Sequence, residues 1–250
     1  VVQNTCDYPN ESNDNVVIQS CKNERDLLTA WSKIIQKENP DIIIGYNIFG
    51  FDYKFMHKRA ESYGASFVND FMKLSRNKDE ICTIKESSIT IASGSHDLYY
   101  INMEGRLQVD LYNYFRREYN LESYKLDYAS GYFIRDTIQT CENNVLKCKS
   151  INGVKVGDFI QVEEIGHSSE FYNNGEKFKI LELNAYENTI HVNKEITPDT
   201  KKTLKWCLAK DDVSPQDIFR MTNEGPKERG IIAKYCIQDC NLVHYLLNKI

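Results

Sequence analysis

The chain lacks the sequence signals of a structural zinc site. It holds eight cysteines but no C-x-x-C pair, and its five histidines are scattered along the sequence, so the closely spaced ligands that hold zinc are missing. A secretory signal and an apolar run of about 18 residues are missing as well. These absences predict a soluble intracellular protein with reduced thiols. The first residue is Val rather than Met, and we expect the chain to be a piece of a longer protein.

An excess of positive charge is also missing. The formal net charge is −5 at pH 7, so the chain as a whole does not attract nucleic acid. A nucleic-acid partner would have to be held by local patches, by metal ions or by a larger parent protein. Apolar residues, in contrast, are plentiful: 41% are hydrophobic and 12% are aromatic, which is enough for a sizeable core. The 250 residues suit one large α/β domain or a domain with a smaller insert.

The first part of the chain alternates between helix and strand signals. Asn23 precedes acidic residues and then apolar residues at helical spacing, which predicts an N-capped helix over 24–38. A strand is expected at 41–46, followed by a second helix over about 51–62. The inward side of this second helix is expected to carry three residues, namely Phe51, Phe55 and Ala60.

The middle of the chain has a different character. A hairpin is predicted after Cys82, with Gly94 in its turn, and two helical stretches follow it. From about 138 to 204, three short alternating runs separated by Gly, Asn and Asp turns indicate a small all-β module. Ser214 and Pro215 then stand in the N-cap and N1 order that begins a helix.

Two short motifs carry residues suited to phosphate chemistry. YNIFGFDY, at 46–53, follows a run of β-forming residues and places Asp52 just beyond a buried strand, where α/β folds position catalytic groups. A long helix over about 226–249 carries Tyr235 and Asp239 one turn apart on the same face. The buried stripe of this helix is expected to hold Ile231, Ile232, Tyr235, Val243 and Leu246. Either motif alone is weak, because many helices contain such pairs by chance.

The order of these motifs resembles the 3′→5′ proofreading exonuclease domain of family B DNA polymerases. Asn47, Phe51 and Asp52 match the second exonuclease motif of that family. Tyr235 and Asp239 match its third motif. Several motifs in the right order are far more specific than any one of them.

A longer stretch carries the same resemblance. GRLQVDLYNYFRREYNLESYKLDYAS, at 105–130, is similar to DNA polymerase delta and to the polymerases of large nucleocytoplasmic DNA viruses. The resemblance implies an α/β fold of the RNase H-like (DnaQ-like) exonuclease type with a small inserted all-β module. It divides the chain into a first exonuclease part at 1–137, the inserted module at 138–204 and a last exonuclease part at 205–250.

The resemblance also implies a chemistry and a set of site residues. In this family four carboxylates hold two divalent ions, Mg²⁺ or Mn²⁺, at the 3′ end of single-stranded primer DNA, and oxygen ligands suit these hard cations. By this match Asp52 and Asp239 are metal ligands, and the Tyr235 hydroxyl orients the attacking water. The residues expected at the DNA are Asn47, Phe51, Arg116 and Arg117, although solvated helix faces explain the two arginines as well.

The first motif of the family, D-x-E, occurs nowhere in the chain. We expect the chain to start downstream of that motif, to end just after the third, and to contain no polymerase palm. The isolated chain is therefore predicted to hold half a metal site and to have little or no nuclease activity. Asp110, in GRLQVD, could substitute for a missing ligand, but a helix-capping role is the alternative.

Two interpretations of the function stay open. The chain is either the proofreading exonuclease part of a replicative DNA polymerase, or a catalytically dead exonuclease-like scaffold module of one; retention of both motifs favours the enzyme. The expected partners are primer DNA, the remainder of the polymerase chain and, through that parent, a sliding clamp or processivity factor, with no membrane. The expected location is the nucleus or a viral replication factory in the cytoplasm. The β module is expected to be a spacer or a protein-docking unit, with nucleic-acid contact through Phe171 and Tyr172 as the alternative.

Overall fold

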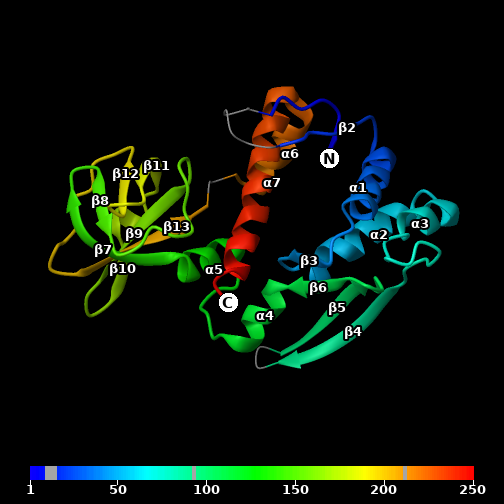
Figure 1. Cartoon of the computed structure of the whole chain (residues 1–250), viewed down its shortest axis with the longest axis horizontal. Helices are drawn as coiled ribbons and strands as arrows, with labels where there is room; N and C mark the ends of the chain where they lie inside the picture. Colours follow the sequence, from blue (N-terminus) through cyan, green and yellow to red (C-terminus); the bar gives the residue numbers. More distant parts are fainter. Residues whose placement is uncertain (9–15, 92–93, 211–212) are drawn as a thin grey trace. The chain divides into compact units, whose positions relative to one another are not determined.

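The computed structural model describes residues 1–8, 16–91, 94–210 and 213–250, and Figure 1 shows the order of its elements along the chain. The chain divides into two compact units. Unit 1 comprises Val1–Leu121 and Val213–Val243, and unit 2 comprises Glu122–Asp212 and His244–Ile250. Within the described ranges, no helix is both long and apolar enough to cross a membrane.

Unit 1 is a mixed α/β assembly. It contains, in chain order, β1 (Val2–Gln3), β2 (Ser20–Cys21), α1 (Glu24–Glu38), β3 (Ile42–Gly45), the π-helix η1 (Ile48–Asp52), α2 (Tyr53–Glu61), α3 (Ala65–Phe71), β4 (Ile84–Ile91), β5 (Gly94–Ile101), β6 (Leu107–Asp110), α4 (Leu111–Glu118), α6 (Pro215–Glu224) and most of α7 (Pro226–Leu247). Its strands pair two by two: β1 with β2 and β3 with β6 in parallel, and β4 with β5 antiparallel. The β3–β6 pairing ends with Gly45 opposite Asp110, so the carboxyl ends of both strands lie side by side.

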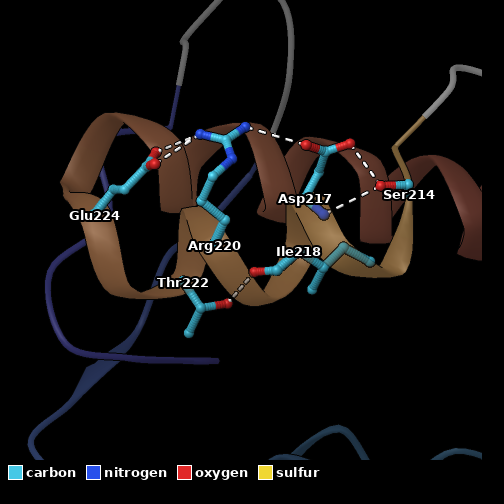
Figure 2. Close-up of polar contacts among 6 residues, drawn as sticks. All are labelled: Ser214, Asp217, Ile218, Arg220, Thr222 and Glu224. Carbon is cyan, nitrogen blue, oxygen red and sulfur yellow. Dashed lines mark hydrogen bonds and ion pairs between the residues drawn. The ribbon is translucent and has the colours of Figure 1, made fainter.

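The two predicted helix caps are confirmed. Asn23 caps α1 by accepting a hydrogen bond from the Asp26 amide at 2.8 Å. At the start of α6, the Ser214 hydroxyl accepts from the Asp217 amide at 3.1 Å and donates to the Asp217 carboxylate at 2.6 Å (Figure 2). Further along α6, Arg220 bridges Asp217 and Glu224.

The predicted inward side of the second helix is wrong for two of its three residues. Ala60 is fully buried, but Phe51 and Phe55 are exposed and stack on each other at 5.5 Å between ring centroids. The physical reason is the π-helix η1, whose wider turn shifts the facing of the side chains, so that Tyr53 enters the core instead.

The predicted stripe on α7 is also wrong at one position. Val243 and Leu246 are buried as expected and Ile232 and Tyr235 are half-buried, but Ile231 is exposed. At this end of α7 the contact surface lies around Gly230 instead. A Cβ atom placed on Gly230 would stand 2.0 Å from the Asp7 carbonyl oxygen, so the main chain of residue 7 covers this side of the helix.

Unit 2 is a small β-barrel that follows the helix α5, and it also includes the end of α7. It contains α5 (Leu126–Phe133), β7 (Arg135–Glu142), β8 (Val145–Cys148), β9 (Phe159–Ile165), β10 (Ser169–Phe171), the 3-10 helix η2 (Tyr172–Asn174), β11 (Phe178–Asn184), β12 (Thr189–Val192) and β13 (Thr203–Ala209). The three alternating runs of the sequence form β9, β11 and β12. The strand order is β10-β9-β11-β12-β8-β7-β13, and a further β9–β13 pairing closes the sheet into a barrel. The sheet begins at Arg135 and ends at Ala209, a little outside the 138–204 expected for the module.

Candidate functional site

The loop that follows β3 has an unusual backbone. Asn47 adopts a left-handed conformation with φ of 61°, which asparagine tolerates better than most residues. Its side chain lies against the main chain of Gly50, because a Cβ atom on Gly50 would stand 2.2 Å from the Asn47 Oδ1 atom. The turn then continues into η1, whose last residue is Asp52. The local sequence therefore delivers Asp52 from a tight turn at the carboxyl end of β3.

Asp110 holds this turn from the neighbouring strand. Its Oδ1 atom accepts hydrogen bonds from the Asn47 amide at 2.7 Å and the Tyr112 amide at 3.1 Å. Its Oδ2 atom accepts from the Phe49 amide at 3.0 Å and from the Asn113 side chain at 3.1 Å. The carboxylate is only 5% exposed. Asp110 thus caps α4, as one of the two sequence interpretations expected, and it also joins α4 to the turn that carries Asp52.

The surroundings of Asp110, Asp52 and Tyr53 disfavour negative charge on these three side chains. Burial raises the pKa of Asp110, although the four donors around the carboxylate lower it in part. Burial also raises the pKa of Asp52, and the nearby Asp110 charge raises it further. The Tyr53 hydroxyl is buried, and its pKa is raised by burial first and then by Asp110 and Asp52.

The second motif lies on α7, directly before Cys240. Tyr235 and Asp239 lie one turn apart on α7, both half-buried, and the Oδ1 atom of Asp239 is shielded from solvent. The pKa of the Cys240 thiol is raised by desolvation, then by the charge of Asp239, and then by the charge of Asp52. One thiol is therefore within electrostatic reach of both carboxylates, although they come from η1 and α7. Both predicted metal ligands belong to unit 1, and the carboxylate whose charge acts on Asp52 is Asp110.

Two carboxylates do not make a complete metal site. Among the residues that the structure describes, no group of three or more His, Cys, Asp or Glu side chains could hold a metal ion. Asp52 and Asp239 are the residues that could contribute to one. Their oxygen donors suit a hard divalent cation.

The residues predicted at the DNA have different surroundings. Phe51 is 58% exposed beside Phe55. Arg116 lies over the Tyr112 ring at 5.1 Å from its centroid and contacts both ring nitrogens of His96 on β5. Arg117 pairs with the adjacent Glu118 at 2.6 Å. None of these contacts requires DNA, so the DNA-binding role of these residues stays a prediction.

Sequence reasoning missed the way that Asp110 joins the two segments. The signal that could have found it is the position of Asp110 at the end of β6, which leads directly into α4 and pairs in parallel with β3, the strand before the turn that carries Asp52. The carboxyl ends of neighbouring parallel strands lie at the same edge of a sheet. The Asp110 side chain at the end of β6 therefore reaches the amides of the turn that follows β3.

Comparisons with known proteins decide the family. A family profile described as DNA polymerase family B, exonuclease domain, matches residues 2–129. The chain belongs to this family. The exonuclease domain is similar to the DNA polymerase of Phaeocystis pouchetii virus, with 39% identity over 100% of this chain and 26% of the relative. It is 37% identical to the DNA polymerase of Pyramimonas orientalis virus over 94% of this chain and 18% of the relative.

Eukaryotic relatives align with less of the exonuclease domain. The DNA polymerase delta catalytic subunit of Candida albicans is 35% identical over 49% of this chain and 12% of its own length. The chain thus spans about a quarter or less of the length of these three relatives. The family match covers the turn with Asp52 but ends before α7, whereas the alignment with the Phaeocystis pouchetii virus polymerase spans the whole chain.

Proposed function

We propose that this domain is the proofreading 3′→5′ exonuclease of a replicative family B DNA polymerase, hydrolysing the terminal nucleotide of mispaired primer DNA. The observation that carries the proposal is the match to the family B exonuclease domain over residues 2–129, which includes the turn that ends in Asp52, together with Tyr235 and Asp239 one turn apart on α7. A scaffold module has no need to keep both acidic motifs.

Asp52 and Asp239 hold divalent metal in this proposal. The fit rests on their chemistry: both supply hard oxygen donors, and the pKa of Asp52 is raised by burial and by Asp110, so a bound cation would relieve an unfavourable charge. Two Mg²⁺ or Mn²⁺ ions, when bound, would stabilise the charge that builds on the attacking and leaving oxygens of a phosphodiester. The two remaining carboxylate ligands are proposed to come from the polymerase outside these 250 residues.

The other site residues orient water and DNA. The Tyr235 hydroxyl, one turn before Asp239 on α7, directs the attacking water toward the phosphorus atom. Phe51 offers an exposed ring on which a 3′-terminal base stacks, and Asn47 fixes the turn below it. Arg116 and Arg117 on α4 contact the phosphates of the primer strand.

The wider setting follows from the same proposal. The fold is of the RNase H-like type, with the β-barrel of unit 2 inserted between its two exonuclease parts. The partners are the rest of the polymerase chain and, through it, a sliding clamp or processivity factor. The site of action is the nucleus or a cytoplasmic viral replication factory.

The test uses the parent polymerase. Asp52→Ala and Asp239→Ala are each expected to lower Mg²⁺-dependent removal of a mispaired 3′ nucleotide at least about a hundredfold, while DNA synthesis continues. Asp70→Ala is the matched control, because Asp70 is an exposed aspartate on α3 that forms a surface ion pair with Lys73. The control is expected to trim the primer like the unaltered polymerase.

The same assay separates the enzyme from the scaffold. Trimming that is absent from the unaltered polymerase would establish the scaffold alternative, whereas trimming that survives both substitutions would exclude Asp52 and Asp239 as the metal ligands. The isolated 250-residue chain is expected to trim little or nothing, because it supplies only two of the four carboxylates. Mg²⁺-dependent trimming by the chain alone would contradict the half-site part of the proposal.

A further inference from the structure

Unit 2 contains a cleft of about 600 Å³ that the proposed hydrolysis does not use. It lies between α5, the start of β7, strands β9 and β10, and the end of β13, and all of its lining residues belong to unit 2. A volume of this order holds a nucleotide-sized group.

Three aromatic rings line this cleft. Tyr128 and Tyr132 lie one turn apart on α5 and stack with 6.4 Å between centroids and 17° between planes. Tyr132 is 40% exposed, and Phe171 on β10 is 46% exposed. Large flat side chains that remain half-exposed inside a concave surface can stack on a nucleobase, because every base has a π-face.

Cationic side chains surround the rings. The Arg135 guanidinium lies 4.7 Å from the Tyr132 ring centroid, and its Nη1 atom donates to Glu163 at 3.0 Å, which fixes its plane beside the ring. The cleft is lined by four cations, namely Lys125, Arg135, Lys177 and Lys210, against three carboxylates, namely Glu122, Asp127 and Glu163. Two of the three carboxylates already form ion pairs, Glu163 with Arg135 and Asp127 with Lys210.

We propose that this cleft binds single-stranded nucleic acid, with bases stacked on Tyr132 and Phe171 and phosphates held by Lys125 and Arg135. The cleft supplies both things that such a strand needs, aromatic surfaces and a local excess of cations, in a chain whose net charge is −5. A proline-rich peptide could use the rings, but it has no use for the cations. The site needs no free 3′ end and is separate from Asp52 and Asp239.

The test measures binding of the full 250-residue chain to a fluorescein-labelled oligothymidine of about 12 nucleotides by fluorescence anisotropy. EDTA is present throughout, so the result does not depend on the proposed nuclease. Tyr132→Ala is expected to weaken binding at least about tenfold, and Tyr132→Phe to leave it unchanged, because only the ring is needed. Tyr186→Ala is the control, since Tyr186 is 96% exposed in the same unit and does not line the cleft; it is expected to bind normally.

A charge variant keeps the test decisive if loss of the Tyr132 ring disturbs its neighbour Arg135. Lys125 is exposed, so Lys125→Glu is expected to leave the thermal unfolding curve unchanged. It should weaken binding and reduce the slope of log affinity against log salt by about 1. Lys147→Glu, an exposed site on β8 outside the cleft, should change neither quantity beyond a weak screening effect.

Three results would overturn the proposal. The first is no binding of oligothymidine at low salt. The second is binding that Tyr132→Ala and Lys125→Glu leave intact, which would place the strand elsewhere on the chain. The third is binding of a proline-rich peptide that Tyr132→Ala abolishes while oligothymidine does not bind, which would make the cleft a peptide site.

Discussion

Replacing Asp110 by asparagine removes one of the two carboxylate oxygens that hold the turn before Asp52. Each carboxylate oxygen accepts two hydrogen bonds. Asparagine has a single side-chain oxygen, so it can replace only one of the two carboxylate oxygens. Asparagine is as good an N-cap as aspartate, so the retained oxygen is expected to stay on the Tyr112 and Asn47 amides. The Phe49 amide then faces the new NH₂ group and loses its acceptor.

The size of the effect follows from this geometry. A buried donor left without an acceptor costs about 1–3 kcal/mol, and the loss of the Asn113 contact adds a smaller amount because its side chain can turn toward water. Removal of a buried charge offsets part of this cost. We therefore expect Asp110→Asn to lower the free energy of unfolding by about 2 kcal/mol. Since Phe49 lies within η1, the displaced turn should also lower kcat of the exonuclease about tenfold or more with KM nearly unchanged.

Urea unfolding of the chain and primer trimming by the parent polymerase measure the two effects. Asn113→Ala is the matched control, because it removes a partner of the same Oδ2 atom and leaves the Phe49 bond in place. The control should cost less than about 1 kcal/mol and leave kcat unchanged. If Asp110→Asn keeps the full kcat and loses no more stability than the control, then Asp110 does not position the turn.

Three further predictions concern stability. The pKa of Asp52 is raised in the folded chain, so this carboxyl keeps its proton at pH values where the unfolded chain has released it, and the group costs stability as the pH rises above its ordinary pKa of 3.8. Asp52→Asn should therefore raise the unfolding temperature at pH 7 in EDTA, with a gain that shrinks toward pH 3.8. An equal gain at both pH values would refute this prediction. Ser214→Ala should lower the free energy of unfolding by about 1 kcal/mol in urea, and no loss would mean that the α6 cap is redundant. Gly50→Ala should cost about 1–3 kcal/mol, because its Cβ atom would meet the Asn47 side chain; unchanged stability would show that the side chain simply moves aside.

Local signals accounted for much of the fold. The cap at Asn23 and the Ser-Pro pair at Ser214 act within one helical turn, so the sequence shows them directly. The π-helix at Ile48–Asp52 was not visible in the sequence. Its Phe49 amide donates a hydrogen bond to Asp110, which lies at the end of another strand far along the chain. Closure of the barrel was not visible either, since the β9–β13 pairing joins residues 38 to 50 positions apart and depends on long-range packing.

The candidate site divides in the same way. Asp52, Tyr235 and Asp239 carry their motifs in the local sequence, so resemblance could identify them. The effect of the Asp52 charge on Cys240 is a tertiary property that no periodicity encodes. The four donors around Asp110 are also tertiary, because they depend on the parallel register of β3 against β6. Resemblance identified the chemistry of these residues, whereas the hydrogen bonds by which Asp110 holds the turn before Asp52 could only be seen in the folded chain.

The barrel lengthens the sequence between Asp52 and Asp239 at little structural cost. Its first and last strands, β7 and β13, pair with each other, with Arg135 opposite Cys207, and the Leu208 amide donates to the Ile134 carbonyl at 2.9 Å. The chain therefore leaves the barrel beside the point where it enters, which is the geometry that tolerates insertion of a whole unit. A polymerase delta relative aligns with only 49% of this chain, whereas the Phaeocystis pouchetii virus polymerase aligns with all of it. Because its two ends meet, such a unit can carry a nucleic-acid cleft of its own without pulling apart the segments that carry the two carboxylates.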